Sequence, residues 1–485
     1  MVGLSVHVLF DCESMAPVLL FVLTIASILL ILTLISQIFK TQNSNLPPGK
    51  TGWPVLGETL AFTSSPEKFV HDRMNMHSSD IFKTCIAGER MAVLCGPSAN
   101  KFIFSNETKL FNPWWPRSVS QALLFAKNAG KISSFLEEDH SFLKLDSMQN
   151  YVPIMDSMAK DHVDTKWSNF DEVKVHPLAK EFTFALACRI FINCGNPNRV
   201  RDLMVPFFAV AEGIMSAPVN FPGTPFRGAV KGGKIIKQRL LEIINERKME
   251  IAEKGIVNLG FQDLLSRLLV SSLEDGKFFS PEEIANKIIG YLIASFYTTS
   301  TAITFVLNHL AEYPHVYDKV LEEQVEIAKS KEAGEMLKWA DVQKMKYTWN
   351  AVCESMRLEP PAQGAFKEVL TDFNFAGFNI PKGWKVLWTV HSTNKNPNYF
   401  ADPEKFDPSR FEGTGPRPFA FVPFGGGPRM CAGKEYARIE ILVFVRNVVT
   451  RFRMKKANPN EKIMHNPEPF PAEGLRICLQ SHGKC

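Results

Sequence analysis

The order of apolar and polar residues predicts a chain that is mainly helical, with small β-sheets. Residues 284–313 form a long apolar run behind a Ser-Pro-Glu-Glu start at residues 280–283, which offers a Ser cap and an acidic first turn. Residues 349–358 have the spacing of a shorter helix that ends at two prolines. Residues 373–388 alternate about two glycine turns, and residues 81–96 contain short β-like runs, so both segments predict small sheets.

An uncharged apolar segment near the N-terminus predicts a single transmembrane anchor. Residues 18–39 carry no charge, and as a helix they would span roughly 33 Å, enough for a bilayer core. A cleaved secretory signal is the alternative, but acidic residues precede the run and no small-residue cleavage site follows it. Lys40 and Lys50 flank the C-terminal end, which places the main domain in the cytosol. The predicted parts are a short lumenal N-terminus (1–14), a transmembrane anchor (15–39), a Pro/Gly linker (40–57) and the main domain (58–485).

Composition and charge exclude some classes of protein. The 485 residues are 45% hydrophobic and 22% charged, which gives a large core and excludes a disordered chain. The net charge of +5 is too small to indicate nucleic acid as a partner. Nine scattered cysteines, an odd number, do not form the pattern of a disulfide framework, so the main domain is expected in a reducing compartment.

One thiol stands in a glycine-rich loop at residues 419–440. Cys431 follows three consecutive glycines and Arg429, and a helical pattern begins after Gly433. Glycine permits left-handed backbone and the close approach of a bulky group, while a helix N-terminus and a nearby Arg both favour thiolate over thiol. This combination suits a large planar metal cofactor. The alternative is an ordinary buried cysteine beside a glycine turn.

The spacing of this loop resembles the haem-binding loop of cytochrome P-450 enzymes. The five matching positions are Phe424, Gly427, Arg429, Cys431 and Gly433. The resemblance implies a cytochrome P-450 fold and haem b bound through the Cys431 thiolate. It also implies NADPH-cytochrome P-450 reductase as the electron donor and a single-pass location in the endoplasmic reticulum membrane, with the catalytic domain (58–485) facing the cytosol.

The long helix at residues 284–313 resembles the helix that crosses the haem in this family. Thr298 matches the threonine whose hydroxyl helps to deliver protons to dioxygen, and Thr299 follows it. The sequence departs from the family at Tyr297, where an acid is usual, and at Ser295, where glycine is common. Tyrosine is a much weaker acid near neutral pH. The alternative is that these hydroxyl residues merely line a buried helix.

Glu354 and Arg357 lie three residues apart and therefore on one helical face. Such a pair is usually a surface ion pair of small energetic value. Followed by Pro360-Pro361 and ahead of the cysteine loop, it resembles the buried pair of the family, and Arg410 supplies the expected third member. The implied role is structural: the network holds the cysteine loop in place.

The resemblance also suggests contacts to the haem propionates and to the substrate. His140 and Lys144 match the propionate-binding positions by spacing, although Lys stands where Arg is usual and the segment after His140 is shorter than in the family. Lys367 is a further propionate candidate. Possible substrate contacts are Trp115, Phe296, Ala362, Phe366 and Phe470.

The runs ESMRLEPPAQGAFKE and FVPFGGGPRMCAGKEYARIEILVF most resemble plant triterpenoid oxidases of the β-amyrin 28-oxidase type, with taxane hydroxylases related. This implies a membrane-anchored monooxygenase that inserts oxygen into an apolar terpenoid, with a pentacyclic triterpene favoured. A diterpenoid or sterol-like hydroxylase is an alternative. A haem- or terpenoid-binding protein with little turnover is another, suggested by Tyr297 and by the short segment after His140.

Overall fold

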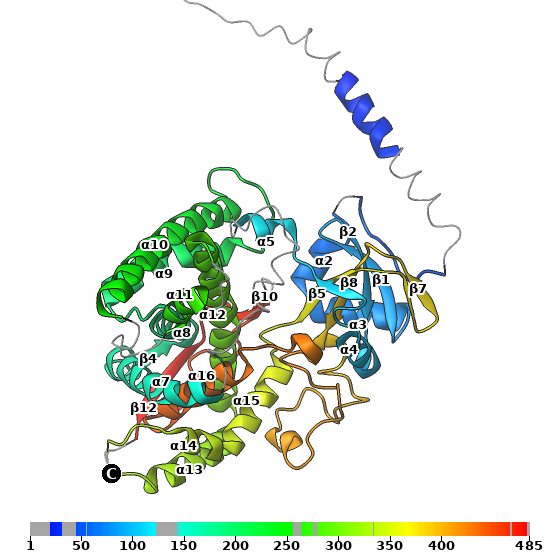
Figure 1. Cartoon of the computed structure of the whole chain (residues 1–485). Coiled ribbons are helices and arrows are strands. Elements are labelled where there is room, and N and C mark those ends of the chain that lie inside the picture. The colour runs from blue at the N-terminus through cyan, green and yellow to red at the C-terminus, as the bar shows by residue number, and fades with distance from the viewer. Residues whose placement is uncertain are drawn as a thin grey trace, which may run out of the picture.

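The computed structural model describes residues 20–31, 45–54, 56–122, 143, 145–255, 263–274, 279–332, 334–465 and 468–482. A large helical region and a smaller β-rich region lie side by side, and the long helix α12 (Pro281–Glu312) runs through the helical region (Figure 1). The expectation of a mainly helical chain with small sheets is confirmed.

The other α-helices described in the main domain belong to the helical region or pack beside the β-rich region. They are α2 (Thr59–Ser64), α3 (Pro66–Met76), α4 (Gly96–Ser105), α5 (Arg117–Ala122), α7 (Leu145–Lys166), α8 (Val175–Ile192), α9 (Pro197–Gly213), α10 (Pro225–Lys254), α11 (Leu264–Glu274), α13 (Pro314–Lys329), α14 (Trp339–Lys344), α15 (Lys346–Leu358) and α16 (Lys434–Val449).

The strands form small sheets. They are β1 (Ile81–Ile86), β2 (Glu89–Leu94), β3 (Phe111–Pro113), β4 (Glu172–Lys174), β5 (Gly364–Val369), β6 (Phe373–Phe375), β7 (Phe378–Ile380), β8 (Lys385–Thr389), β9 (Phe452–Lys456), β10 (Ile463–His465), β11 (Pro469–Pro471) and β12 (Arg476–Ser481). The largest sheet has the order β1-β2-β8-β5-β3, in which only the β2–β8 pair is parallel. The other sheets are β4-β12-β9, β10-β11 and β6-β7.

Helix α12 begins and ends where local chemistry dictates. The Ser280 hydroxyl accepts a hydrogen bond from the Glu283 N–H at 3.2 Å, and the Glu283 carboxylate accepts one from the Ser280 N–H at 2.8 Å. This capping box satisfies two backbone donors that the first turn would otherwise leave unpaired. Pro314 follows closely after the last helical residue, Glu312. The helix packs on α8, α10, α15 and α16, so it lies in the largest hydrophobic core of the molecule.

The anchor predicted at residues 15–39 is only partly described. Residues Leu20–Ile31 form an apolar helix with exposed side chains, and this helix is shorter than a membrane span requires. Within the described ranges, α12 alone has the length and hydropathy of a spanning helix, and most of it is buried in the core. The structure therefore shows a short apolar helix ahead of the main domain and does not confirm a single span.

Candidate functional site

The loop that carries Cys431 is held by its own backbone. The Cys431 N–H donates to the Phe424 carbonyl at 2.9 Å, and the Met430 N–H donates to the Gly427 carbonyl at 3.2 Å. The aromatic ring of Phe424 stacks on Trp349 of α15 with centroids 6.5 Å apart. These contacts fold residues 424–431 into a tight turn directly ahead of α16, as the sequence predicted.

Two glycines in this loop are required by space and backbone angle. Gly427 has φ of +69°, and a Cβ there would lie 2.3 Å from the backbone oxygen of Phe104. A Cβ on Gly426 would lie 2.6 Å from the Phe104 ring. Real Cβ atoms do not approach other atoms this closely, so the loop can press against α4 only with glycine at both positions. Phe104 thus packs against Gly426 and Gly427 of the cysteine loop.

The Cys431 thiol is accessible, and its surroundings suit haem. The side chain is exposed, whereas most of the other described cysteines are buried. Across the described parts of the chain, no group of three His, Cys, Asp or Glu side chains could hold a bare metal ion. A single sulfur donor beside small glycines suits a metal that arrives with a planar ring of its own ligands, as iron does in haem.

Although the Cys431 side chain reaches the surface, the surrounding protein atoms exclude much of the water around its thiol, and this burial raises the pKa of the thiol above its ordinary value. A hydrogen bond from the Gly433 backbone opposes the shift. The sequence predicts that the helix N-terminus and Arg429 favour the thiolate. In the protein chain alone, the pKa of the thiol is nevertheless raised, because burial outweighs the Gly433 hydrogen bond. Binding of the sulfur to a metal cation would lower the pKa of the thiol, because thiols that ligate a metal lose their proton.

Glu107 joins the cysteine loop to β5 in a way that the sequence did not indicate. One carboxylate oxygen contacts the Lys367 ammonium, and the other accepts a hydrogen bond from the Arg429 N–H at 3.1 Å. Lys367 and Glu107 are 6% and 5% exposed, so this is a buried ion pair. Lys367, the predicted propionate contact, therefore contacts Glu107 here. His140 and Lys144, the other propionate candidates, lie outside the described residues.

One face of α12 is accessible although most of the helix is buried. Ala294 is exposed, and Gly290, Tyr297 and Thr298 are partly exposed, which is the three- and four-residue spacing of a single helical face. The Thr298 hydroxyl donates to the Ala294 carbonyl at 3.0 Å, so its oxygen lies on this face and retains lone pairs to accept a proton. Thr299 is only 2% exposed and does not share the accessible face.

The structure brings Glu354, Arg357 and Arg410 together in one network. The Arg357 guanidinium donates two hydrogen bonds of 2.7 Å to the Glu354 carboxylate, and both side chains are 0% exposed. Arg410 Nε lies 3.2 Å from the same carboxylate. Arg357 also donates to the carbonyls of Asn394, Pro403 and Lys405 at 2.8, 2.7 and 3.2 Å, which fixes the long segment that leads toward the cysteine loop.

The predicted substrate contacts divide by exposure. Ala362 is exposed, and Phe366 and Phe470 are partly exposed, so all three side chains remain accessible. Trp115 is 43% exposed. Phe296 departs from the expectation: it is 1% exposed and packs in the core among Phe184, Phe207 and Phe208. The helical turn places it away from Ala294 and Thr298, so it is a core residue.

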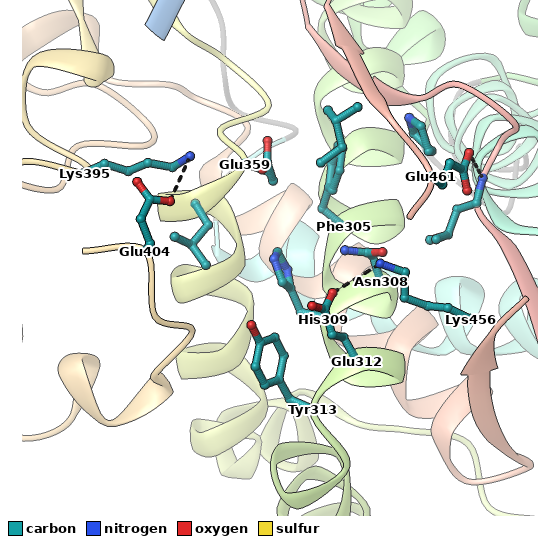
Figure 2. A pocket seen from close by; sticks show the side chains of 14 residues that line it. Phe305, Asn308, His309, Glu312, Tyr313, Glu359, Lys395, Glu404, Lys456 and Glu461 are labelled. Atoms are coloured by element: carbon teal, nitrogen blue, oxygen red, sulfur yellow. Dashed lines mark hydrogen bonds and ion pairs between the residues drawn. The ribbon is translucent and has the colours of Figure 1, made fainter. Parts of the chain in front are cut away.

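A polar cavity of about 190 Å³ lies where the second half of α12 meets the end of α15 and the β10–β11 hairpin. Figure 2 shows Glu359 pointing into it between Phe305 of α12 and the ion pair formed by Lys395 and Glu404. Asn308 of α12, which is 9% exposed, also lines this cavity. Glu359 directly precedes the proline pair that leads to Ala362, so the cavity borders the start of a segment expected to contact substrate.

The carboxyl of Glu359 is expected to make stability fall as pH rises. Burial raises its pKa from 4.5 to about 7, with Lys395 opposing and Glu67 and Glu404 adding to the shift. The folded state therefore holds this proton more tightly than the unfolded state, and stability is lost between about pH 4.5 and 7. Glu359→Gln should gain up to about 3 kcal/mol over wild type on going from pH 4.5 to pH 8, measured by denaturant unfolding. Glu404→Gln, at an exposed neighbour, is the control and should show little pH-dependent gain.

Comparison with known proteins identifies the family. The Cytochrome P450 family profile matches residues 47–478. The chain belongs to this family, so it is a haem-dependent monooxygenase, an oxidoreductase, and carries the cytochrome P450 fold. The retinoic acid-bound cyanobacterial CYP120A1 superposes with a TM-score of 0.80 at 29% identity, covering 91% of this chain and 100% of that one.

Characterised relatives are similar over nearly the whole length. Beta-amyrin 6-beta-monooxygenase of Solanum lycopersicum is 52% identical over 450 residues, which cover 91% of this chain and 94% of the relative. Beta-amyrin 28-monooxygenase of the same species is 49% identical over 475 residues, covering 96% and 99%. The Panax ginseng beta-amyrin 28-monooxygenase is 51% identical over 448 residues, covering 90% and 92%. The resemblance drawn from the two sequence runs is thereby confirmed.

Proposed function

We propose that this protein oxidises a pentacyclic triterpene, using dioxygen and electrons supplied by a reductase. The observation that carries the proposal is the identity of about 50% to several beta-amyrin monooxygenases across more than nine-tenths of the chain. The accessible face of α12 and the partly exposed Phe366 and Phe470 supply apolar surface for such a substrate. Which carbon is oxidised is a separate question, because the relatives are named for oxidation at different positions, 6-beta and 28.

The cysteine loop, Thr298 and the buried ion-pair network each have a role in this proposal. Cys431 would ligate the haem iron, and Phe424, Gly427, Arg429 and Gly433 would shape the loop around it. The haem, once bound, supplies the oxygen-activating chemistry of its class. Thr298 Oγ1, on the accessible face of α12, would hold a proton for transfer. Glu354, Arg357 and Arg410 keep the loop in position.

The cellular setting is a second part of the proposal. Helix Leu20–Ile31 is apolar and exposed along its length, as expected for part of a membrane anchor. Together with the linker at 40–57, it would attach the catalytic domain to the cytosolic side of the endoplasmic reticulum membrane. NADPH-cytochrome P450 reductase is the proposed electron donor.

Coexpression with this reductase in yeast microsomes tests the function. Fed with β-amyrin, the microsomes should form products that contain one or more added oxygen atoms, detected by mass spectrometry. Taxane-type diterpenes and sterols are fed in parallel. Oxygenation of these compounds without oxygenation of β-amyrin would overturn the triterpene assignment.

A haem-binding protein with little turnover is the second candidate, and Tyr297 is the observation that favours it. Burial raises the pKa of the Tyr297 hydroxyl above its ordinary value, so it is an even weaker proton donor than free tyrosine. A thiolate-type spectrum after reduction and CO binding, with no oxygenated product from any of the terpenoids fed, would support this candidate.

Replacing Thr298 by valine should lower the product formed per NADPH consumed by about tenfold or more, because the proton-carrying hydroxyl is lost from the accessible face. Thr301→Val is the matched control, because Thr301 lies on the same helix but is 1% exposed. Product and NADPH are measured in the same microsomes. Equal coupling in Thr298→Val and wild type would show that this hydroxyl does not take part.

A further inference from the structure

Tyr297, the residue before Thr298 on the accessible face of α12, lies near two charged side chains. The Lys180 ammonium of α8 lies 5.4 Å from the centre of the Tyr297 ring. Glu468, immediately before β11, interacts electrostatically with both Lys180 and Tyr297. Lys180, Tyr297 and Glu468 are each partly exposed, although α8 and α12 are otherwise mostly buried. Part of each side chain is therefore accessible from solvent.

The strand that carries Glu468 is fixed against the two helices. Phe470 of β11 stacks on the His176 ring of α8, with centroids 6.4 Å apart and the ring planes 22° from parallel. His176 Nδ1 in turn lies 3.2 Å from Thr304 Oγ1 of α12. The β10–β11 hairpin is thus tied to α8 and α12, and this contact holds Glu468 close to Lys180 and Tyr297.

No direct hydrogen bond or ion pair joins the three groups to one another within the described residues. Lys180 lies over the Tyr297 ring, and the Glu468 carboxyl accepts a hydrogen bond from its own backbone N–H. Burial raises the pKa of Glu468 to about 7 and lowers the pKa of Lys180, with Glu212 of α9 opposing the shift at Lys180. Aromatic side chains, including Phe296 and Phe470, lie nearby. Polar groups in such surroundings favour a partner that completes their hydrogen bonds.

We propose that Lys180, Tyr297 and Glu468 form a subsite that binds a hydroxyl group of the substrate. A hydroxyl oxygen can accept hydrogen bonds from Lys180 and Tyr297, while its proton is donated to Glu468. A carboxylate would be repelled by Glu468 and Glu212, and a cation by Lys180, so a neutral alcohol fits best. This inference rests on the proposed function: an otherwise apolar terpenoid with one hydroxyl would be oriented on α12 by that group.

Binding measurements with two ligands test the subsite. The holoenzyme is titrated, by equilibrium dialysis, with β-amyrin and with the analogue in which its hydroxyl is replaced by hydrogen. The wild-type protein should bind the alcohol at least tenfold more tightly. In Tyr297→Phe and Lys180→Met, this preference should fall to near one, with binding of the deoxy analogue unchanged. The haem spectrum of each variant establishes that it is folded.

Matched controls are Tyr313→Phe, at the end of the same helix, and Lys237→Met on α10. Both should keep the wild-type preference. Equal affinity of wild type for alcohol and deoxy analogue, or a preference that survives both subsite variants, would overturn the subsite. Oxygenation of both ligands with equal affinity would leave the proposed function standing without the subsite. Failure of the holoenzyme to bind or oxidise either ligand would overturn both the subsite and the proposed function.

Discussion

Replacing Cys431 by alanine should abolish the thiolate-type spectrum of the reduced, CO-bound protein and reduce product formation below detection. The thiol is accessible in a loop fixed by hydrogen bonds to Phe424 and Gly427, and across the described residues no other donor group is arranged to hold a metal ion. The P450 class depends on a thiolate that pushes electron density to favour O–O cleavage. Without the sulfur, iron loses both its protein ligand and this electronic effect.

Two further variants separate loss of the ligand from loss of the fold. Cys478→Ala removes another exposed thiol, on β12, and should keep the wild-type spectrum and activity. Cys431→His retains a possible iron ligand, and haem bound to it should lack the thiolate-type spectrum. A thiolate-type spectrum that persists in Cys431→Ala would show that the ligand assignment is wrong.

Local chemistry explains which features could be predicted from sequence. The start of α12 depends on Ser280 and Glu283, which are neighbours in sequence, and the structure forms their capping box. The turn at Cys431 depends on glycines inside the same loop. Glu354 and Arg357 are one helical turn apart, so their pairing follows from helix geometry.

Contacts between distant segments could not be predicted in the same way. Glu107 reaches both Lys367 and the Arg429 backbone across more than 250 residues, and no local pattern marks it. The packing of Phe104 under Gly426 depends on how α4 meets the loop. Phe296 was expected near substrate, but its orientation depends on which face of α12 is buried by Phe207 and Phe208. In each case tertiary packing determines which residues come into contact.

The buried ion pair of Glu354 and Arg357 predicts a large effect on stability when Arg357 is replaced. Arg357→Met should destabilise the protein by about 3–5 kcal/mol, because it removes the two shortest charged contacts of the buried Glu354 carboxylate and leaves it only Arg410, at 3.2 Å, as a charged partner. It also removes the donors that bind the carbonyls of Asn394, Pro403 and Lys405. Guanidinium unfolding gives the loss of stability, and haem content after purification reports whether the cysteine loop still holds its cofactor.

Arg476→Met is the matched control for that variant, because Arg476 forms an ion pair with Glu172 at 2.7 Å while its side chain is 44% exposed. An exposed pair contributes about 0–1 kcal/mol, so the control should unfold close to wild type. The double variant Glu354→Gln, Arg357→Met removes the buried charge along with its partner, and should recover part of the loss. If Arg357→Met unfolds like Arg476→Met, the buried network does not stabilise the fold. If stability falls but haem content does not, the network supports the core without positioning Cys431.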